Sequence, residues 1–425
     1  MSLKVGVIGQ GTMGSNLSLN IGSKHPTYIF NRTVAKSIGT KNRGIEQGIR
    51  VDISDNFVEM MYNLKNADRG IIVSMLPSGK ASDNIIMTIA SLLKDNYIDN
   101  VSIIDGSNEN YKRSSNRSRA INQMGIPYMG VGISGGSVGA RNGPCMMVGG
   151  SKATYDAHKD FFDSISPSNI HIDGDRGNGH LIKSIHNGIE YVMMQCIGEV
   201  YHIYSHLGFS RFDIVEKFKM MRDSAIGGFL LDTTIDALSL NDVDTVQDVS
   251  DFNETCKWTV EYALANDIYA PSIAASLNSR IGSSYRNGHT CPIETNDTRP
   301  SIPVDFDSRV LSTMEFVYSA AFSQAELLID KVDTTVSTYD IFDSWKTGTI
   351  ILCNGLGNVL NDHTMFQSVD DARYMANFAI ENKIPIPSIS ESITYCDTVN
   401  SHCIPSSQVI QIQRSTFGSH PMNYF

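Results

Sequence analysis

The sequence lacks any long hydrophobic run. No stretch reaches the roughly 20 consecutive apolar residues that a helix needs to span a bilayer, and no apolar signal segment precedes the strand-like run Leu3–Ile8. Cysteine is also scarce: the seven cysteines are odd in number and contain no Cys-x-x-Cys pair, which disfavours a disulfide framework and a zinc site. We therefore expect a cytoplasmic protein with free thiols and no membrane partner.

Positive charge is in short supply as well. Lys and Arg number 34 against 45 Asp and Glu, which gives a formal net charge of −11. This balance argues against a nucleic-acid partner, because a phosphate backbone attracts basic proteins. If the protein binds an anionic substrate, its Lys and Arg side chains must be concentrated at the substrate-binding site.

Two kinds of pattern divide the chain. Strand-like runs alternate with helical stretches as far as residue 173, which predicts a mostly parallel, doubly wound sheet. Helical periodicity dominates from Gly179 onward. We expect an α/β Rossmann-type domain over residues 1–176 and an all-α domain over residues 177–425. The expected strands are Leu3–Ile8, Thr27–Phe30, Gly70–Met75, Val101–Asp105 and Pro127–Val131. The pattern changes after Ile170–Asp173, and a long loop is expected over Asn287–Asp305.

A glycine motif stands between the first strand and the first helix. Glycines at this place allow a tight turn and let the backbone approach a pyrophosphate, while the helix N-terminus supplies amides to the phosphates. A G-x-G-x-x-G motif alone is weak evidence for dinucleotide binding, but its position between a strand and a helix strengthens that evidence. The motif predicts a dinucleotide site that includes Gly9, Gly11, Met13 and Gly14.

The end of the second strand selects the dinucleotide. This strand ends in Asn31-Arg32-Thr33, about twenty residues past the glycines. An acidic residue here holds the ribose 2′-hydroxyl of NAD, whereas an arginine accommodates the 2′-phosphate of NADP. The sequence therefore favours NADP. The alternative is that Arg32 is an ordinary surface residue.

Three later segments follow strand ends, where ligands bind in sheets of this kind. They are Met75–Ser78, Asp105–Asn108 and the glycine-rich stretch Gly132–Pro144. In the last, backbone amides are free to approach a carboxylate or hydroxyl closely, although the composition fits a flexible surface turn equally well. These amides are those of Ser134, Gly135 and Gly136.

The stretch Gly179–Tyr191 carries an amine, an imidazole, a carboxamide and a carboxylate. Read as a helix, it places these groups within an arc of about 100°, with apolar residues on the other side. A base and an acid on one face can share a substrate. Taken alone, the helix fits better with a solvated polar face. The four residues are Lys183, His186, Asn187 and Glu190.

Motifs along nearly the whole chain resemble those of the 6-phosphogluconate dehydrogenase family. They are Gly9–Gly14 with Asn31–Thr33, Ser134–Gly136 with Gly139–Arg141 and Gly143-Pro144, His180–Tyr191, Lys257–Thr259 with Arg280, and Gln411–His420. The resemblance implies oxidative decarboxylation of 6-phosphogluconate to ribulose 5-phosphate and CO2, a step of the pentose phosphate pathway. It implies NADP as hydride acceptor and no metal.

The resemblance also implies roles for single residues. Lys183, neutral at rest, takes the proton of the carbon-3 hydroxyl and then polarises the new ketone, and Glu190 protonates the enediol at carbon 1. A neutral lysine requires a pKa depressed from about 10.4. His186, Asn187, Asn108 and Ser134–Gly136 hold the substrate, and Asn108 also contacts the cofactor.

The phosphate end of the substrate is assigned in the same way. Arg414 and His420 come from the partner subunit in that family, which makes a homodimer necessary for activity. For each lone Lys or Arg outside its motif, a solvated surface charge is the alternative. The implied substrate contacts at this end are Tyr191, Lys257, Thr259, Arg280, Arg414 and His420.

The chain departs from the family in three places. Ser137-Val138 stands where the family usually has an acidic pair, and the usual lysine is missing at Pro77–Gly79, although Lys80 is near. The chain stops at Phe425, short of the family's usual tail, so we expect a less interlocked dimer. These departures keep open a catalytically weak NADP-binding sensor or scaffold. A dehydrogenase for a smaller β-hydroxy acid is a further alternative, which the phosphate-binding cations disfavour.

Overall fold

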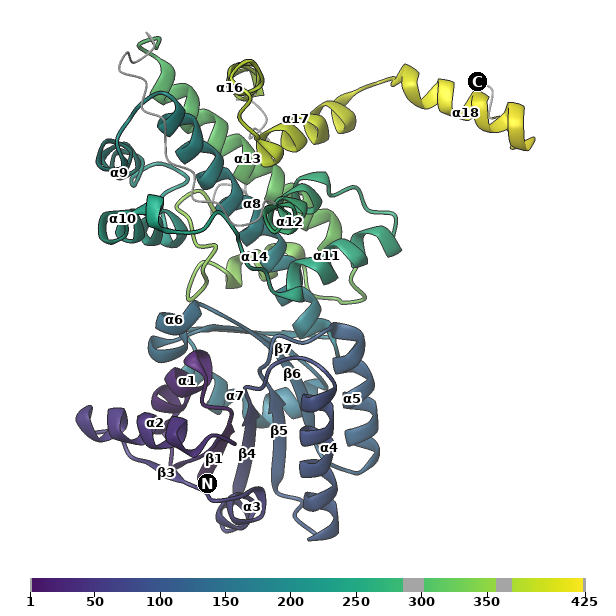
Figure 1. The fold of residues 1–425 in the computed structure, drawn as a ribbon. Coiled ribbons are helices and arrows are strands. Elements are labelled where there is room, and N and C mark those ends of the chain that lie inside the picture. The colour runs from purple at the N-terminus through teal and green to yellow at the C-terminus, as the bar shows by residue number, and fades with distance from the viewer. Residues whose placement is uncertain (1, 286–301, 357–368, 423–425) are drawn as a thin grey trace.

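The computed structural model describes residues 2–285, 302–356 and 369–422. Its N-terminal part is an eight-stranded sheet in the order β3-β2-β1-β4-β5-β6-β7-β8, parallel at every pair except β6 and β7 (Figure 1). The predicted Rossmann-type sheet is confirmed. The strands are β1 Leu3–Ile8, β2 Thr27–Phe30, β3 Val51–Ile53, β4 Arg69–Ser74, β5 Val101–Asp105, β6 Tyr128–Ser134, β7 Cys145–Gly149 and β8 Ser168–Ile172.

Several elements of this part were not predicted, among them β3, β7 and the helix α6 (Gly136–Asn142). β3 has only three residues, too few to show an alternating pattern. The glycine-rich stretch, read as a possible flexible turn, contains α6. This helix turns the chain back so that β7 runs antiparallel to β6.

Apolar side chains cover both faces of the sheet. Val5 and Val7 lie in one buried cluster with α1 and α7, whereas Ile72 and Ile103 lie in another with α3, α4 and α5. Helices on both faces are what a doubly wound parallel sheet requires. The helices of this part are α1 Thr12–Gly22, α2 Val34–Glu46, α3 Phe57–Lys65, α4 Lys80–Asp95, α5 Tyr111–Gln123 and α7 Lys152–Ile165.

The C-terminal part is helical, as predicted. It is built around α8 and α13, whose apolar side chains form one large buried cluster. Within the described residues no helix is long and apolar enough to cross a membrane. Most of the loop expected over Asn287–Asp305 lies outside the described residues. The helices are α8 Asn178–His206, α9 Arg211–Met220, α10 Phe229–Leu240, α11 Glu254–Ala265, α12 Pro271–Ser283, α13 Phe306–Ile329, α14 Thr338–Ser344, α16 Val369–Glu381, α17 Pro387–Asn400 and α18 Pro405–Gly418, with a short 3-10 helix at Val243–Thr245.

The start of α8 is pressed against the sheet, because glycines stand at the contact. A Cβ on Gly132 of β6 would lie 2.4 Å from the Cβ of Lys183, and a Cβ on Gly179 would lie 2.5 Å from the carbonyl oxygen of Gly130. No larger residue fits at either place without moving backbone or the start of a side chain. The close approach brings the polar side chains of α8 to the end of β6.

A buried carboxylate joins the middle of α8 to the start of α17. Glu199 accepts hydrogen bonds from the backbone N–H of Ser388 at 2.8 Å and of Ile389 at 3.1 Å. It also accepts from the hydroxyl of Ser388 at 2.8 Å and from Gln195 at 3.0 Å. Burial raises the pKa of this carboxyl to about 7. The side chain supplies acceptors to a helix N-terminus that has no cap of its own.

We expect Glu199→Ala to destabilise the protein by about 3 kcal/mol, because it leaves buried backbone N–H groups without acceptors. Thermal unfolding followed by circular dichroism measures the effect. Glu216→Ala, at a side chain that is 68% exposed, is the matched control and is expected to change stability by less than about 0.5 kcal/mol. Equal melting temperatures for the two variants would show that Glu199 has no capping role.

Candidate active site

The turn between β1 and α1 has room for a ligand at one glycine only. Gly9 has φ +95°, and a Cβ there would lie 2.4 Å from the carbonyl oxygen of Met75. A Cβ on Gly14 would lie 2.0 Å from the carbonyl oxygen of Gly9, whereas at Gly11 no atom lies within 4 Å. The first and third glycines are therefore required by chain packing. The second faces open space beside the N-terminus of α1, which no side chain caps.

The end of β2 is tied to this turn. The backbone N–H of Gln10 donates to Oδ1 of Asn31 at 2.9 Å, and Nδ2 of Asn31 donates to the carbonyl of Thr33 at 3.0 Å. Arg32 is exposed, and among the described residues it has no hydrogen-bond or ion-pair partner. Its guanidinium is thus available to a phosphate. Met13 is half-buried in the first turn of α1.

The polar face of α8 forms a connected cluster at the end of β6. Nζ of Lys183 donates to Oδ1 of Asn187 at 2.6 Å and lies 3.2 Å from Nδ1 of His186. Nε2 of His186 lies 2.9 Å from Oγ of Ser134. Nδ2 of Asn187 donates to the hydroxyl of Thr255 on α11 at 2.8 Å. Each of these contacts fixes the amine of Lys183, directly or through a neighbour.

Burial changes the protonation of this cluster. It lowers the pKa of Lys183 to about 8, and it holds the pKa of His186 well below the usual range of an imidazole. Burial also raises the pKa of Glu190, one helical turn or two beyond them. Desolvation disfavours the charged form in every case. The result is a lysine that releases its proton near neutral pH, next to a carboxyl that binds one more readily than usual.

One aromatic side chain contacts His186, and the glycine loop packs against the segment that follows this aromatic residue. Gly135 (φ +108°) and Gly136 (φ +59°) lead into α6, and a Cβ on Gly135 would lie 2.6 Å from the carbonyl oxygen of Gly348. The buried indole of Trp345 meets the imidazole edge-on, with ring centroids 5.3 Å apart. Trp345 was not predicted as a site residue, because no local pattern relates residue 345 to residue 186.

The expected phosphate contacts are only partly assembled. The guanidinium of Arg280 lies 3.7 Å from the ring centroid of Tyr191, and Lys257 is exposed on α11. Thr259 differs from the expectation: it is fully buried, and its hydroxyl donates to the carbonyl of Ser184 at 2.5 Å. In this structure Thr259 joins α11 to α8 and does not face open space.

Arg414 and His420 lie far from the site of their own chain. Figure 1 shows α18 standing away from the rest of the molecule, and none of its residues is buried. Four apolar side chains of this helix are exposed, which is unusual for a helix with no partner. They are Val409, Ile410, Ile412 and Phe417.

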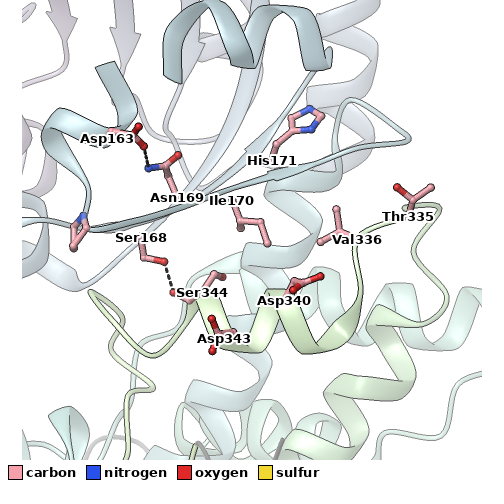
Figure 2. A pocket seen from close by; sticks show the side chains of 11 residues that line it. Asp163, Ser168, Asn169, Ile170, His171, Thr335, Val336, Asp340, Asp343 and Ser344 are labelled. Carbon is pink, nitrogen blue, oxygen red and sulfur yellow. Dashed lines mark hydrogen bonds between the residues drawn. The ribbon is translucent and has the colours of Figure 1, made fainter. Parts of the chain in front are cut away.

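A cavity of about 600 Å³ lies elsewhere, between β8 and α14. Figure 2 shows Asp163, Asp340 and Asp343 around it, with Ser168 bonded to the carbonyl of Ser344 at 2.6 Å. None of the predicted site residues lines it. The part of the chain that the structure describes holds no group of three or more His, Cys, Asp or Glu side chains placed to bind a metal ion.

Family models match both parts of the chain. Residues 4–174 match the NAD binding domain of 6-phosphogluconate dehydrogenase, and residues 179–424 match the C-terminal domain of the same enzyme. The chain is 30% identical to a decarboxylating 6-phosphogluconate dehydrogenase of Spinacia oleracea, over 98% of this chain and 94% of the relative. It is also 30% identical to the corresponding protein of Staphylococcus aureus, over 99% and 96%.

Solved structures give the same result. The 6-phosphogluconate dehydrogenase of Plasmodium falciparum, described in apo form and in complex with NADP+ and with 6-phosphogluconate, superposes with a TM-score of 0.88. It is 28% identical, and the match covers 99% of this chain and 98% of that one. A 3-hydroxyisobutyrate dehydrogenase of Salmonella typhimurium shares the fold at a TM-score of 0.51 and 14% identity, over 68% of this chain. The chain belongs to the 6-phosphogluconate dehydrogenase family.

Proposed function

We infer that the chain catalyses the NADP-dependent oxidative decarboxylation of 6-phosphogluconate to ribulose 5-phosphate and CO2. One observation carries the proposal: the buried amine of Lys183, whose pKa is lowered to about 8, and the carboxyl of Glu190, whose pKa is raised, lie on one face of α8. The reaction needs a base at carbon 3 and later an acid at carbon 1. The full-length family match supports this substrate.

The side chains divide the proton transfers between them. Neutral Lys183 takes the proton of the carbon-3 hydroxyl, and its ammonium form then donates a hydrogen bond to the new ketone, which favours loss of CO2. Glu190 gives its proton to carbon 1 of the enediol. His186 and Asn187 hold the amine in place and, with Ser134–Gly136, orient the hydroxyls and carboxylate.

NADP, when bound, supplies the hydride acceptor, and the residues present fit it. The open face at Gly11 and the uncapped start of α1 suit the pyrophosphate, with Gly9, Met13 and Gly14 around it. The free guanidinium of Arg32, next to Asn31 and Thr33, suits the 2′-phosphate. We assign contacts with cofactor and substrate to Asn108, and its exposure just past the end of β5 supports this assignment.

We assign the substrate phosphate to cations of two chains. Lys257 and Arg280 come from one chain, with Tyr191 beside them, and Arg414 and His420 from a second copy. The exposed apolar residues of α18 support a homodimer, because association removes them from water.

We place the boundary between the two domains at residue 176. The two family models support this position, because the first match ends at residue 174 and the second begins at residue 179. A cytoplasmic location is part of the proposal, and the free thiols of the described cysteines support it.

A catalytically weak NADP-binding protein is the second candidate. One observation favours it: Val138, in place of the expected acidic side chain, is 59% exposed at the start of α6. A third candidate function is a dehydrogenase for a smaller β-hydroxy acid. It has less support, because the 3-hydroxyisobutyrate dehydrogenase shares only its fold with this chain.

An absorbance assay for NADPH separates these candidates. We expect turnover with 6-phosphogluconate and NADP, much slower turnover with NAD, and none with 3-hydroxyisobutyrate. Tight NADP binding without turnover of 6-phosphogluconate would overturn the proposal in favour of a sensor or scaffold. Turnover of 3-hydroxyisobutyrate would instead indicate the smaller substrate.

A further inference from the structure

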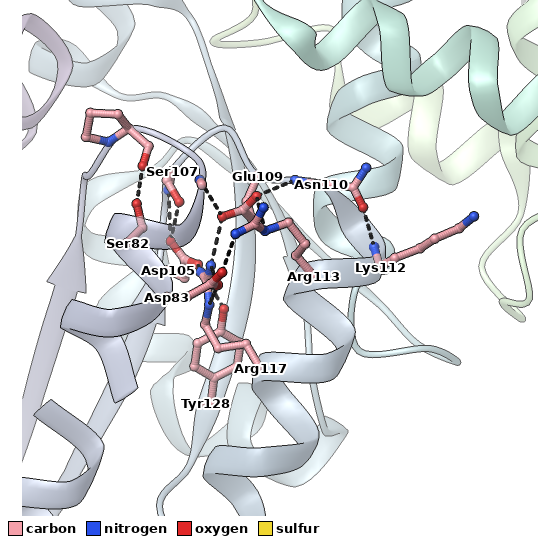
Figure 3. A network of polar contacts seen from close by, with 12 residues as sticks. Ser82, Asp83, Asp105, Ser107, Glu109, Asn110, Lys112, Arg113, Arg117 and Tyr128 are labelled. Atoms are coloured by element: carbon pink, nitrogen blue, oxygen red, sulfur yellow. Dashed lines mark hydrogen bonds and ion pairs between the residues drawn. The ribbon is translucent and has the colours of Figure 1, made fainter. Parts of the chain in front are cut away.

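A largely buried cluster of charged side chains includes Asp105 and Glu109, which stand on either side of Asn108 in the chain (Figure 3). Its centre is Arg117 of α5, whose side chain is 2% exposed and pairs with Asp83, Asp105 and Glu109. The Nη2 atom of Arg117 lies 2.8 Å from Oε2 of Glu109. The carboxylates of Asp105 and Glu109 are fully buried. None of these charged groups takes part in the proton transfers described above.

The cluster fixes the backbone on both sides of Asn108. Asp105 accepts hydrogen bonds from the backbone N–H of Ser107 at 3.3 Å and from the hydroxyl of Tyr128 at 2.9 Å. Glu109 accepts from the backbone N–H of Asn110 at 2.9 Å. Ser107 and Glu109 are buried, whereas Asn108 between them is exposed. The direction of the Asn108 side chain is therefore set by its two anchored neighbours.

The same cluster reaches a second loop. The backbone N–H of Gly79, which has φ +122°, donates to Oε2 of Glu109 at 3.4 Å. Gly79 ends the segment that follows β4, the strand next to β5. One carboxylate thus holds loops at the carboxyl ends of two adjacent strands, where ligands of doubly wound sheets bind.

Stability alone does not account for such a cluster. Buried ion pairs recover little more than the cost of removing their charges from water, and apolar replacements are often as stable. Here three carboxylates, including that of Asp83, face the guanidiniums of Arg117 and of the half-exposed Arg113. Because this cluster holds more negative than positive charge, the cost of desolvating it is high and its contribution to stability is small. Its hydrogen bonds do, however, hold the backbone atoms around Asn108 and at Gly79 in fixed positions.

We propose that Glu109 and Arg117 are positioning residues for NADP, which act by holding Asn108 and the turn at Gly79. The proposal deepens the proposed function and rests on its NADP site, but not on its substrate. A carboxylate serves Arg117 and Gly79 through Oε2 and Asn110 through Oε1. A glutamine has a single acceptor oxygen and leaves one side of this arrangement without a partner.

The test is a fluorescence titration of the full-length enzyme with NADPH, which needs no turnover. We expect Glu109→Gln to raise the Kd for NADPH about five- to tenfold. The KM for NADP should rise by the same factor, with kcat within about twofold of wild type. Arg119→Gln, on the same helix at a side chain that is 63% exposed, is the matched control and should leave both unchanged.

A double-mutant cycle separates positioning from general loosening. Because Glu109 acts partly through Asn108, the loss of NADPH affinity in Glu109→Gln combined with Asn108→Ala should be smaller than the product of the two single losses. Fully additive losses, or a Kd for Glu109→Gln equal to that of wild type, would overturn the proposal. Tyr128→Phe removes one hydrogen bond to Asp105 and should raise the Kd about twofold, so it provides a second test if Glu109→Gln does not fold. An enzyme that binds NADPH as described but does not turn over 6-phosphogluconate would contradict the proposed function alone.

Discussion

We expect Lys183→Met to lower kcat by about a thousandfold or more, while the Kd for NADPH stays within about twofold of wild type. Methionine nearly matches the volume of the lysine side chain but supplies neither a base nor a hydrogen-bond donor to the ketone, and each of these contributions is large. Stopped-flow absorbance of NADPH measures the loss. Lys257→Met is the matched control: its exposed amine is assigned to the phosphate, so KM should rise and kcat should change little.

The pH dependence of the wild-type enzyme tests the same assignment. Because burial lowers the pKa of Lys183 from 10.5 to about 8, the amine is protonated below this pH and cannot accept the substrate proton. We therefore expect kcat/KM to fall by about tenfold for each pH unit below 8, since this ratio reports ionisations of the free enzyme. A kcat/KM that is constant between pH 6 and 8 would contradict Lys183 as the base.

The second large effect concerns the projecting helix. We expect Arg414→Met to raise the KM for 6-phosphogluconate by about 30- to 100-fold, which corresponds to the loss of one charge-assisted hydrogen bond to phosphate. The KM for NADP should not change, because Arg414 is assigned to the substrate phosphate and to no part of the NADP site. Initial rates at varied substrate concentration give both constants.

Mixing the Lys183→Met and Arg414→Met variants, at a substrate concentration well below the raised KM, shows which chain supplies Arg414. In a dimer of Lys183→Met with Arg414→Met, one site combines an intact Lys183 with an intact Arg414 only if the arginine crosses to the partner. Random exchange then restores about a quarter of wild-type activity. No recovery, in mixtures that have exchanged subunits, would place Arg414 in the site of its own chain.

The sequence predicted what depends on local order and missed what depends on distant contacts. The glycine turn and the polar face of α8 follow from spacing alone, because neighbouring residues create them. The contact of Trp345 with His186 was missed, because it joins elements far apart in the chain. Arg117 was missed for the same reason: an isolated arginine usually indicates a surface charge.

Thr259 shows a further limit. Its place in a motif predicted a substrate contact, yet its hydroxyl is occupied by the backbone of α8. A motif preserves residue types that a site needs, without stating which of them touch the ligand and which support those that do. Only the packing of α11 on α8 distinguishes the two.

The close glycine contact between the start of α8 and β6 determines where two related enzymes can be joined to make an active chimaera. Gly132 and Gly179 fix Lys183 relative to the strands, although the residue belongs in sequence to the helical part. A chimaera of two related enzymes joined near residue 176 would take Lys183 from one parent and the strand β6, against which Lys183 packs, from the other.

A junction within α8 beyond Tyr191 would keep the base and the acid with the sheet. It would exchange the recognition of phosphate, together with the contacts of Thr255 with Asn187 and of Trp345 with His186. The segment that must come from one parent to keep the catalytic residues in place therefore includes the sheet and about the first four turns of α8.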